Sequence, residues 1–406
     1  MVKLTRRTAL TGMAAVPMLA MPAIVRAQGS KSIKIGLVSD LSGPYRDIGG
    51  VGNKVASEMA IHDFGGTVLG RPIEVLQGDS LDKPDTGSAL ARRWADTDHV
   101  DLLCDGASSS VGLAVQQVSR EKKIPFMVVD PASSAFTGEE CSPFCVQWIY
   151  DTYALAQVVG GAMTRAGGNT WFFITADYAF GYALEHDTGA AVEKAGGKVL
   201  GRVRAPLATQ DFSSYLLQAQ ASKAKVIGLA NAGTNTQDCI KQAAEFGITQ
   251  HGQKLATLLM TIADVNSLGQ KIAQGLTFST SFYWAMTPKT IAWSKRYMAK
   301  MTTPPTQAHA ASYASTLHWL HAVKAAGSTD GAKVMAHMKA TPVNNFYNHN
   351  IKIRQDGRVM NAMYLWEVKP ASESKFKYDY FKHIATVPGE QAFRPLADGH
   401  CSFIKA

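Results

Sequence analysis

The sequence has little that would support a metal site, a disulfide scaffold or a nucleic-acid surface. Its 406 residues include only five cysteines, and no CxxC motif or Cys/His spacing suggests a zinc site. The formal net charge is +9, but no run of five or six like charges occurs, which argues against a nucleic-acid partner. We therefore expect no metal, no cofactor and no nucleic acid to be bound.

Motifs for nucleotide binding and catalysis are also missing. Residues 49–52 are rich in glycine but lack the G-x-G-x-x-G spacing, and no Walker sequence occurs. Residues 106–110 resemble a nucleophile elbow, except that Ser110 stands where glycine is needed. His318 and His321 lie one helical turn apart, without a carboxylate near in sequence to complete a metal motif. These absences favour a binding protein, with an exported hydrolase as the less favoured alternative.

The first 27 residues are typical of an export signal. Arg6 and Arg7 precede a short apolar run, and small residues surround a cleavage point near Ala27. The paired arginines indicate the twin-arginine route. A membrane anchor is the alternative, but one glycine and two prolines interrupt a run that is short for the ~20 residues of a span. No later apolar stretch is long enough to cross a bilayer, so we expect a soluble periplasmic protein.

Short apolar segments alternate with helical patterns along most of the chain, which predicts two α/β units with mainly parallel sheets. The expected strands are 33–38, 71–77, 101–105 and 125–129 in the first unit, and 171–175, 198–205, 226–229, 254–260 and 275–279 in the second. Three helical segments follow at 288–301, 308–326 and 331–339. Residues 350–367 are expected to form a hairpin that turns at Asp356-Gly357.

Three loops that follow apolar strands are rich in serine and glycine: residues 41–45, 106–110 and 131–134. Ligands of open parallel sheets bind beyond the carboxyl ends of the strands, so two facing units predict a cleft that closes by a hinge motion. Short hydroxyl side chains beside free N–H groups at helix starts favour an anion such as a carboxylate. Simple helix capping is the alternative explanation for each loop.

The order of these motifs resembles the periplasmic solute-binding proteins of ABC importers, in the branched-chain amino acid family. The resemblance spans about residues 31–370 and depends on five segments: 35–38, 41–44, 106–110, 131–134 and 177–181. It implies the type I periplasmic binding protein fold, which has two Rossmann-like α/β lobes, three hinge crossings and a ligand between the lobes. It also implies an ABC permease as the partner of a monomer.

The resemblance divides the mature chain between the two lobes. Lobe 1 is expected to contain residues 31–151 and 283–346, and lobe 2 residues 152–282 and 347–406. The same fold serves sensors that report a solute to a signalling partner, which is a further alternative.

The resemblance also implies ligand-binding residues. Ser108, Ala132 and Ser134 fall where the family holds an amino acid's carboxylate, and Tyr45 and Phe180 fall at aromatic positions. Further aromatic contacts are expected from Trp148, Tyr150 and Tyr283.

The sequence departs from the amino-acid binders at two positions. Thr261 stands where they often have an acidic residue for the ammonium group, and Ala232 stands at an aromatic position. A buried ammonium group without an anionic partner carries a large desolvation cost. We therefore predict a small carboxylate, such as a benzoate or phenylpropenoate derivative, with a branched-chain or other amino acid or amide as the alternative.

Three cysteines lie in loop-like or terminal surroundings, and one pair among them could be oxidised in the periplasm: Cys141, Cys145 and Cys401. The stretch 141–153 looks like a branch of the family that includes binders of aromatic acids. In that branch a cysteine in the C-terminal tail is usual, which favours Cys141 with Cys401. Cys141 with Cys145 is the alternative.

Overall fold

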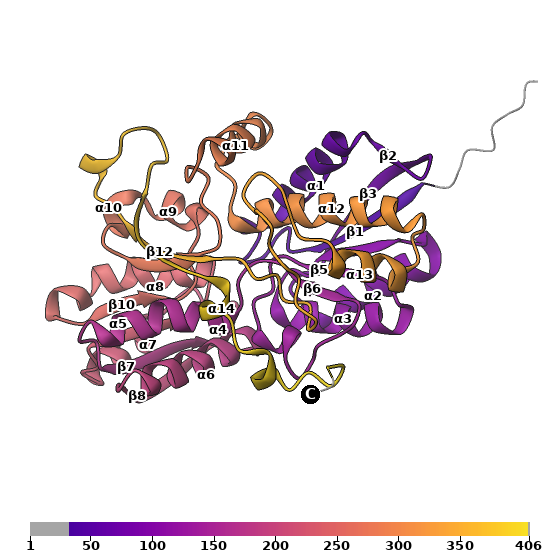
Figure 1. Ribbon diagram of the computed structural model, residues 1–406. Coiled ribbons are helices and arrows are strands. Elements are labelled where there is room, and N and C mark those ends of the chain that lie inside the picture. Colours follow the sequence, from indigo (N-terminus) through magenta and orange to yellow (C-terminus); the bar gives the residue numbers. More distant parts are fainter. Residues whose placement is uncertain (1–31, 405–406) are drawn as a thin grey trace, which may run out of the picture.

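The computed structural model describes residues 32–404, so the export signal and its cleavage point near Ala27 lie outside the described residues. Two α/β lobes lie next to each other, and each has a central sheet with helices on its faces (Figure 1). Lobe 1 contains a six-stranded sheet in the order β2-β3-β1-β4-β5-β6. Lobe 2 contains a seven-stranded sheet in the order β13-β12-β11-β10-β9-β7-β8. The expected α/β architecture of two lobes is confirmed.

The elements of lobe 1 are β1 (Ile33–Ser39), α1 (Gly50–Phe64), β2 (Thr67–Val68), β3 (Arg71–Asp79), α2 (Pro84–Arg93), β4 (Leu102–Asp105), α3 (Ser109–Lys122), β5 (Phe126–Val128), β6 (Cys145–Gln147), α11 (Pro288–Met301), α12 (Gln307–Ala326) and α13 (Gly331–Ala340). The strand neighbours are parallel except β2 with β3. Parallel strands are buried on both faces, which is why β1 and β4 consist almost entirely of apolar residues.

The elements of lobe 2 are α4 (Thr152–Leu155), α5 (Gly161–Arg165), β7 (Thr170–Ala176), α6 (Ala179–Lys194), β8 (Lys198–Ala205), α7 (Ser213–Ala221), β9 (Val226–Ala230), α8 (Thr234–Glu245), β10 (Lys254–Thr257), α9 (Ile262–Leu268), α10 (Gln270–Ala273), β11 (Thr277–Thr280), β12 (Met363–Val368), β13 (Phe381–Val387) and α14 (Gly389–Ala392). Strands β7 to β11 pair in parallel, whereas β12 and β13 add an antiparallel edge.

The prediction of a β-hairpin at residues 350–367 is wrong, because residues 350–362 do not form strands of the sheet. The sheet hairpin is formed instead by β12 and β13. A turn does occur at Asp356-Gly357, but it is closed by a single bridge between Ile353 and Val359. Arg358 beside it bridges to Gln147 at the edge of β6, so this segment belongs to a connection between the lobes. The contact between Gln147 and Arg358 joins residues far apart in the sequence, so no local hydrophobic periodicity could predict it.

The chain passes between the lobes at residues 148–151, 281–287 and 341–362. The first and third crossings are joined by the fully buried side chain of Arg358. Its Nη2 donates to the carbonyl of Ile149 at 2.6 Å and its Nη1 to that of Tyr150 at 3.3 Å, while Asp151 Oδ2 lies 3.6 Å from Nη1. A single guanidinium group therefore organises the hinge.

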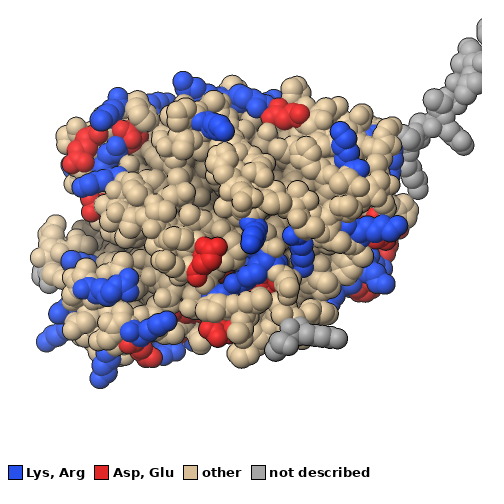
Figure 2. Space-filling model, in the orientation of Figure 1, with Lys and Arg blue, Asp and Glu red and all other residues tan. Residues whose placement is uncertain are grey.

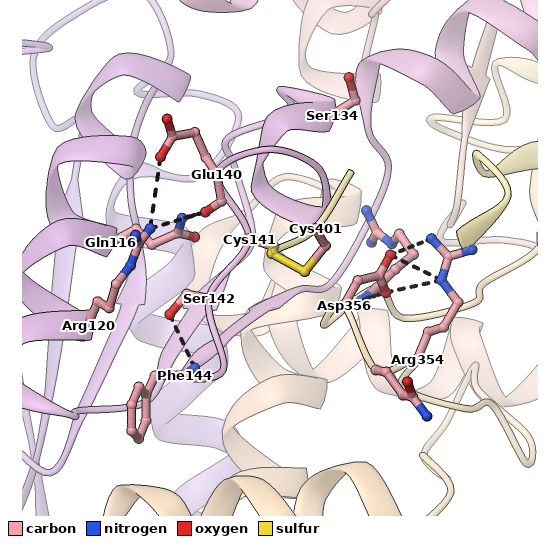
Figure 3. Close-up of a disulfide and its surroundings, with 12 residues drawn as sticks. Gln116, Arg120, Ser134, Glu140, Cys141, Ser142, Phe144, Arg354, Asp356 and Cys401 are labelled. Atoms are coloured by element: carbon pink, nitrogen blue, oxygen red, sulfur yellow. Dashed lines mark hydrogen bonds and ion pairs between the residues drawn. A yellow bond between two sulfur atoms is a disulfide. The ribbon is translucent and has the colours of Figure 1, made fainter. Parts of the chain in front are cut away.

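The C-terminal tail returns to lobe 1, which differs from the expected placement of residues 347–406 in lobe 2. A disulfide joins Cys401 to Cys141, and Figure 3 shows it beside the loop that carries Glu140 and Ser142. Arg394 Nη2 also donates to the carbonyl of Ser134 at 2.9 Å. The tail is thus a fourth passage across the cleft.

The remaining cysteines, Cys104, Cys145 and Cys239, are free and buried. Within residues 32–404 no helix has the length and hydrophobicity to cross a bilayer. On the face shown in Figure 2, basic side chains are scattered, with acidic ones among them.

Candidate functional site

A small cavity of about 20 Å³ lies between the lobes. It is lined by Tyr45, Ile48, Ala107, Ser108, Ser109, Asp130, Pro131, Ala132, Tyr150, Tyr178, Phe180, Ala232 and Leu259. The loops that follow β1, β4 and β5 supply the wall in lobe 1, and those that follow β7, β9 and β10 supply the wall in lobe 2. The cavity therefore lies at the carboxyl ends of both parallel sheets, where open α/β sheets bind ligands.

One wall is the amino-terminal end of α3. Ser108 is the N-cap residue, but its side chain makes no capping hydrogen bond and contacts the carboxyl group of Asp82 instead. Ser109 Oγ accepts hydrogen bonds from the N–H groups of Ala132 at 3.3 Å and Ser133 at 3.1 Å, which joins the loop after β4 to the loop after β5. The first turn of a helix offers unpaired N–H groups and a positive dipole end. This wall is suited to an anion.

The backbone that leads into this wall has an unusual conformation. Asp105 and Ala107 have positive φ angles of 79° and 52°, which are rare for residues with a side chain. Such strain gathers at binding sites, where the surrounding structure holds it in place. Here it turns the chain from β4 sharply into α3.

Aromatic residues from both lobes form another part of the lining. The hydroxyl oxygens of Tyr45 in lobe 1 and Tyr178 in lobe 2 are 2.6 Å apart, and the Tyr178 ring centroid is 6.0 Å from that of Phe180. Tyr150, from the first crossing, is also buried. Burial raises the pKa of Tyr45, Tyr150 and Tyr178, so all three phenols are neutral at physiological pH. This part of the lining offers flat apolar faces and neutral hydroxyl groups.

Direct contacts between the lobes show that the cleft is closed. The Thr234 N–H donates to the carbonyl of Pro44 at 3.3 Å, and Ser134 Oγ donates to Asp187 Oδ2 at 2.9 Å. Gly233 has a φ of 57°, and a Cβ atom there would lie 2.2 Å from the Pro44 carbonyl oxygen. Only glycine allows the two loops to approach so closely.

Carboxyl groups gather behind the lobe 1 wall. Asp40 Oδ1 and Oδ2 accept N–H groups from the loop that carries Tyr45, with Tyr45 itself donating at 2.7 Å. Asp82 lies beside Asp40, and burial, followed by the charge of Asp40, raises the pKa of Asp82 to about 8. Burial also raises the pKa of Asp105 and of its neighbour Asp130. The folded protein therefore holds protons on carboxyl groups that are ionised in the unfolded chain at neutral pH.

The raised pKa of Asp82 predicts a slope in the pH dependence of stability. An unfolded aspartate titrates near pH ~4, so the folded state binds the extra proton between about pH 4 and 8. The free energy of unfolding is therefore expected to fall as the pH rises through this window, and Asp82→Asn is expected to make the slope shallower. Urea denaturation between pH 4 and 9 measures it.

Asp79→Asn is the control, because the pKa of Asp79 is lowered by hydrogen bonds from Leu81, Ser42 and Leu41, which outweigh its partial burial. Asp79 contributes stability that is present above pH ~4 and lost below it, so its variant should change mainly the acid limb. Its effect above pH ~4 should be small, because the charge of Asp79 is the last of the causes that raise the pKa of Asp82. An unchanged slope between pH 4 and 8 in Asp82→Asn would contradict the assignment.

The structure brings six of the ten expected ligand-binding residues around the cavity: Tyr45, Ser108, Ala132, Tyr150, Phe180 and Ala232. The other four lie elsewhere. Ser134 binds Asp187, and Trp148 is fully buried against His318, with ring centroids 5.8 Å apart. An aromatic or hydroxyl side chain has the same appearance in sequence whether it lies in a core or in a cleft.

The remaining two residues, Thr261 and Tyr283, line a separate small cavity near the second crossing. Thr261 caps α9, and its Oγ1 donates to Asp264 Oδ2 at 2.8 Å. Tyr283 stacks on Phe381 with ring centroids 4.5 Å apart. The loop after β10 contributes Leu259, not Thr261, to the lining of the cavity between the lobes.

Seven lining residues were not expected from the sequence: Ile48, Ala107, Ser109, Asp130, Pro131, Tyr178 and Leu259. Tyr178 lies in segment 177–181 and Ser109 in segment 106–110, so both were within reach of the motif. Asp130 precedes the serine-rich loop and carries no local signal of its own.

Comparison with known proteins identifies the family. Residues 32–375 match the family described as periplasmic binding protein. The chain belongs to this family. Its fold is that of the type I periplasmic binding proteins of ABC transporters. Proteins of this family bind small solutes in the periplasm.

Two solved periplasmic binding proteins are similar over nearly the whole chain. One, a periplasmic binding protein from Burkholderia mallei, is 48% identical with a TM-score of 0.91, covering 92% of this chain and 100% of that one. The other, a branched chain amino acid ABC transporter periplasmic ligand-binding protein from Burkholderia xenovorans, is 35% identical with a TM-score of 0.81, covering 91% and 99%.

More distant relatives share the fold. A solute binding protein from Rhodopseudomonas palustris in complex with 3,4-dihydroxybenzoic acid is 22% identical with a TM-score of 0.80, covering 89% of this chain and 98% of that one. The Leu/Ile/Val-binding protein homolog 6 of Brucella melitensis is 25% identical over 258 residues, which are 63% of this chain. The match spans 65% of that relative's length.

Proposed function

We propose that this periplasmic binding protein captures a small aromatic carboxylic acid by closing its lobes and delivers it to an ABC permease. The observation that carries the proposal is one cavity between the lobes that is lined both by the start of α3 and by four aromatic residues: Tyr45, Tyr150, Tyr178 and Phe180. The export signal of residues 1–27, cleaved near Ala27, would bring the receptor to the periplasm by the twin-arginine route.

The electrostatics of the cavity restrict how an anion can be held. None of the described residues that line it is a lysine, arginine or histidine. A carboxylate would therefore depend on the N–H groups at the start of α3 and on the Ser108 hydroxyl. Since α3 has 14 residues, its dipole is fully developed at this end.

The lining of the cavity favours a flat ligand. Four of the residues that line it are aromatic, and aromatic faces stack on flat ligands. Structural neighbours from Rhodopseudomonas palustris were solved with 3,4-dihydroxybenzoic acid, benzoate and 4-hydroxybenzoate. These neighbours support the idea that the fold accommodates such acids.

A receptor for an amino acid is the second candidate, because Asp130 lines the cavity and offers a carboxyl group to an ammonium group. The relatives from Burkholderia xenovorans and Brucella melitensis carry names of this class. The two candidates differ in the ligand that stabilises the protein most.

Thermal unfolding with benzoate, 3-phenylpropenoate, leucine and valine distinguishes the candidates. A ligand at a hundredfold excess over its Kd adds about 2.7 kcal/mol to the free energy of unfolding. We expect an aromatic acid to raise the Tm most. A larger rise with leucine or valine would overturn the proposal in favour of the amino-acid receptor.

Two aromatic substitutions test whether this cavity is the binding site. Phe180→Ala is expected to weaken aromatic acid binding about tenfold, because a buried ring contact is lost. Tyr283→Leu is the matched control, because Tyr283 is equally buried but lies outside the cavity. Titration calorimetry should show an unchanged Kd for the control. Equal losses in both variants would contradict the site.

A further inference from the structure

Asp130 carries the one carboxyl group among the described residues that line the cavity. It is only 8% exposed and lines the cavity, and its Oδ1 has no hydrogen-bond partner among the described residues. An unpaired buried acceptor is destabilising unless something binds to it. Most buried polar atoms in native proteins have partners, so this atom points to a group on the ligand.

The carboxyl group of Asp130 is held firmly in place. Asn53 Nδ2 donates to its Oδ2 at 3.1 Å. Gly49 packs against the same group, and a Cβ atom at position 49 would lie 1.9 Å from Oδ2. Pro131 follows directly and restricts the backbone. Because Oδ2 is fixed from two sides, Oδ1 cannot turn away to another partner.

The surroundings of Asp130 determine its charge. Its carboxyl group forms a hydrogen bond with that of Asp105, which in turn accepts the Ser39 hydroxyl at 2.5 Å. Two buried carboxyl groups in contact cannot both be ionised, so they share one proton. Asn53 also contacts both groups. No N–H or O–H group of another described residue donates to Asp130 Oδ1.

Other titratable groups near the pair do not change this conclusion. Asp40 adds negative charge, and Asp82 lies beside Asp40. The phenol of Tyr150 is neutral and lies 3.5 Å from the Asp130 carbonyl oxygen. His309 Nε2 lies 2.9 Å from the carbonyl oxygen of Gly49, the residue that packs against Asp130. Burial lowers the pKa of His309 to about 4, so its ring is neutral at physiological pH as well. The acidic neighbours strengthen the tendency of the pair to keep its proton.

Resting on the proposed function, we propose that Asp130 Oδ1 accepts a hydrogen bond from a hydroxyl group of the bound acid. The receptor then selects hydroxy-substituted aromatic acids over the parent acids. An acid without the hydroxyl group leaves Oδ1 unpaired in the closed cavity, which is the situation in which a binding site discriminates most strongly. A neutral acceptor also tolerates the ligand's carboxylate nearby, whereas an ionised Asp130 would repel it.

Calorimetry with benzoate and with 2-, 3- and 4-hydroxybenzoate tests the proposal on the full mature chain. We expect at least one hydroxybenzoate to bind the wild-type protein about tenfold or more tightly than benzoate. In Asp130→Ala this ratio is expected to fall to about one, because the acceptor is gone. The ratio is taken within each variant, so a uniform loss of affinity cancels. Circular dichroism checks that the variant is folded.

Asp105→Asn is the matched control, because it disturbs the same buried pair but does not line the cavity. It is expected to keep the hydroxyl preference, even if every acid binds more weakly. A preference that survives in Asp130→Ala, or is lost in Asp105→Asn alone, would overturn the assignment to Asp130.

The remaining outcomes separate this proposal from the proposed function. Binding of benzoate with no preference for any hydroxybenzoate would overturn the role of Asp130 and leave the aromatic acid receptor standing. Binding of leucine but of no benzoate would overturn both proposals and make Asp130 an ammonium partner.

Discussion

Replacing Arg358 with methionine is expected to lower the free energy of unfolding by about 3–5 kcal/mol. The guanidinium group is fully buried and donates to the carbonyls of Ile149 and Tyr150, and it lies over the ring of Phe393 at 4.4 Å. Methionine keeps the length of the side chain but leaves both carbonyls unpaired. It also leaves Asp151, which is buried, without its cationic neighbour.

Chemical denaturation at pH 7 measures the loss. Arg92→Met is the control, because the Arg92–Glu121 ion pair is half exposed and such pairs contribute little to stability. If Arg358→Met and Arg92→Met have equally small effects, then Arg358 does not hold the hinge.

A second substitution tests the cause of the loss. Burial raises the pKa of Asp151, and Arg358 opposes this rise. Without Arg358 the carboxyl group is easier to protonate, so the loss of stability should shrink as the pH falls. Adding Asp151→Asn to Arg358→Met should recover part of the loss, because no unpaired charge then remains buried. No recovery would mean that the carbonyl contacts alone carry the effect.

Removing the Cys141–Cys401 disulfide is expected to destabilise the protein by about 2–5 kcal/mol. The bond closes a loop across 260 positions of sequence and ties the tail to lobe 1. The double variant Cys141→Ser/Cys401→Ser avoids leaving a reactive thiol. Denaturation with and without a reductant measures the effect, since reduction should weaken the wild-type protein and leave the variant unchanged.

Mass spectrometry of non-reduced fragments checks the pairing. Peptides with Cys141 and Cys401 should be linked, whereas Cys104, Cys145 and Cys239 should react with an alkylating agent only after unfolding, because all three are buried. A link between Cys141 and Cys145 would contradict the structure. A difference below about 1 kcal/mol between the double variant and the wild-type protein would mean that the disulfide does not stabilise the fold.

Most of the secondary structure could be predicted from local patterns. The apolar run 33–38 became β1, and the helical patterns at 288–301 and 308–326 became α11 and α12 within one residue. Such segments carry their signal in their own composition and periodicity. Residues 350–362 have no such signal, because their conformation depends on Arg358 reaching the carbonyls of a crossing some 200 residues away.

The lining of the cavity could be predicted in part. Ser108 and Ala132 lie in strand-end loops, and the ends of parallel strands meet at one edge, so their position beside the cavity follows from local patterns. Trp148 and Tyr283 lie outside this cavity, and composition does not distinguish an aromatic ring in a core from one in a cleft. The sequence did not predict that Asp130 lines the cavity, because an aspartate before a proline is typical of many turns.

The sequence by itself determined the two α/β lobes, the family and the loops that meet at the cleft, because these follow from patterns within short segments. Only the tertiary structure decided which side chains line the cavity, which of the two possible cysteine pairs forms and where the tail runs. Each of these depends on contacts between residues far apart in sequence, such as Tyr45 with Tyr178 and Asp105 with Asp130. The protonation of Asp130 also depends on the tertiary structure, because burial and the neighbouring carboxyl group of Asp105 raise its pKa.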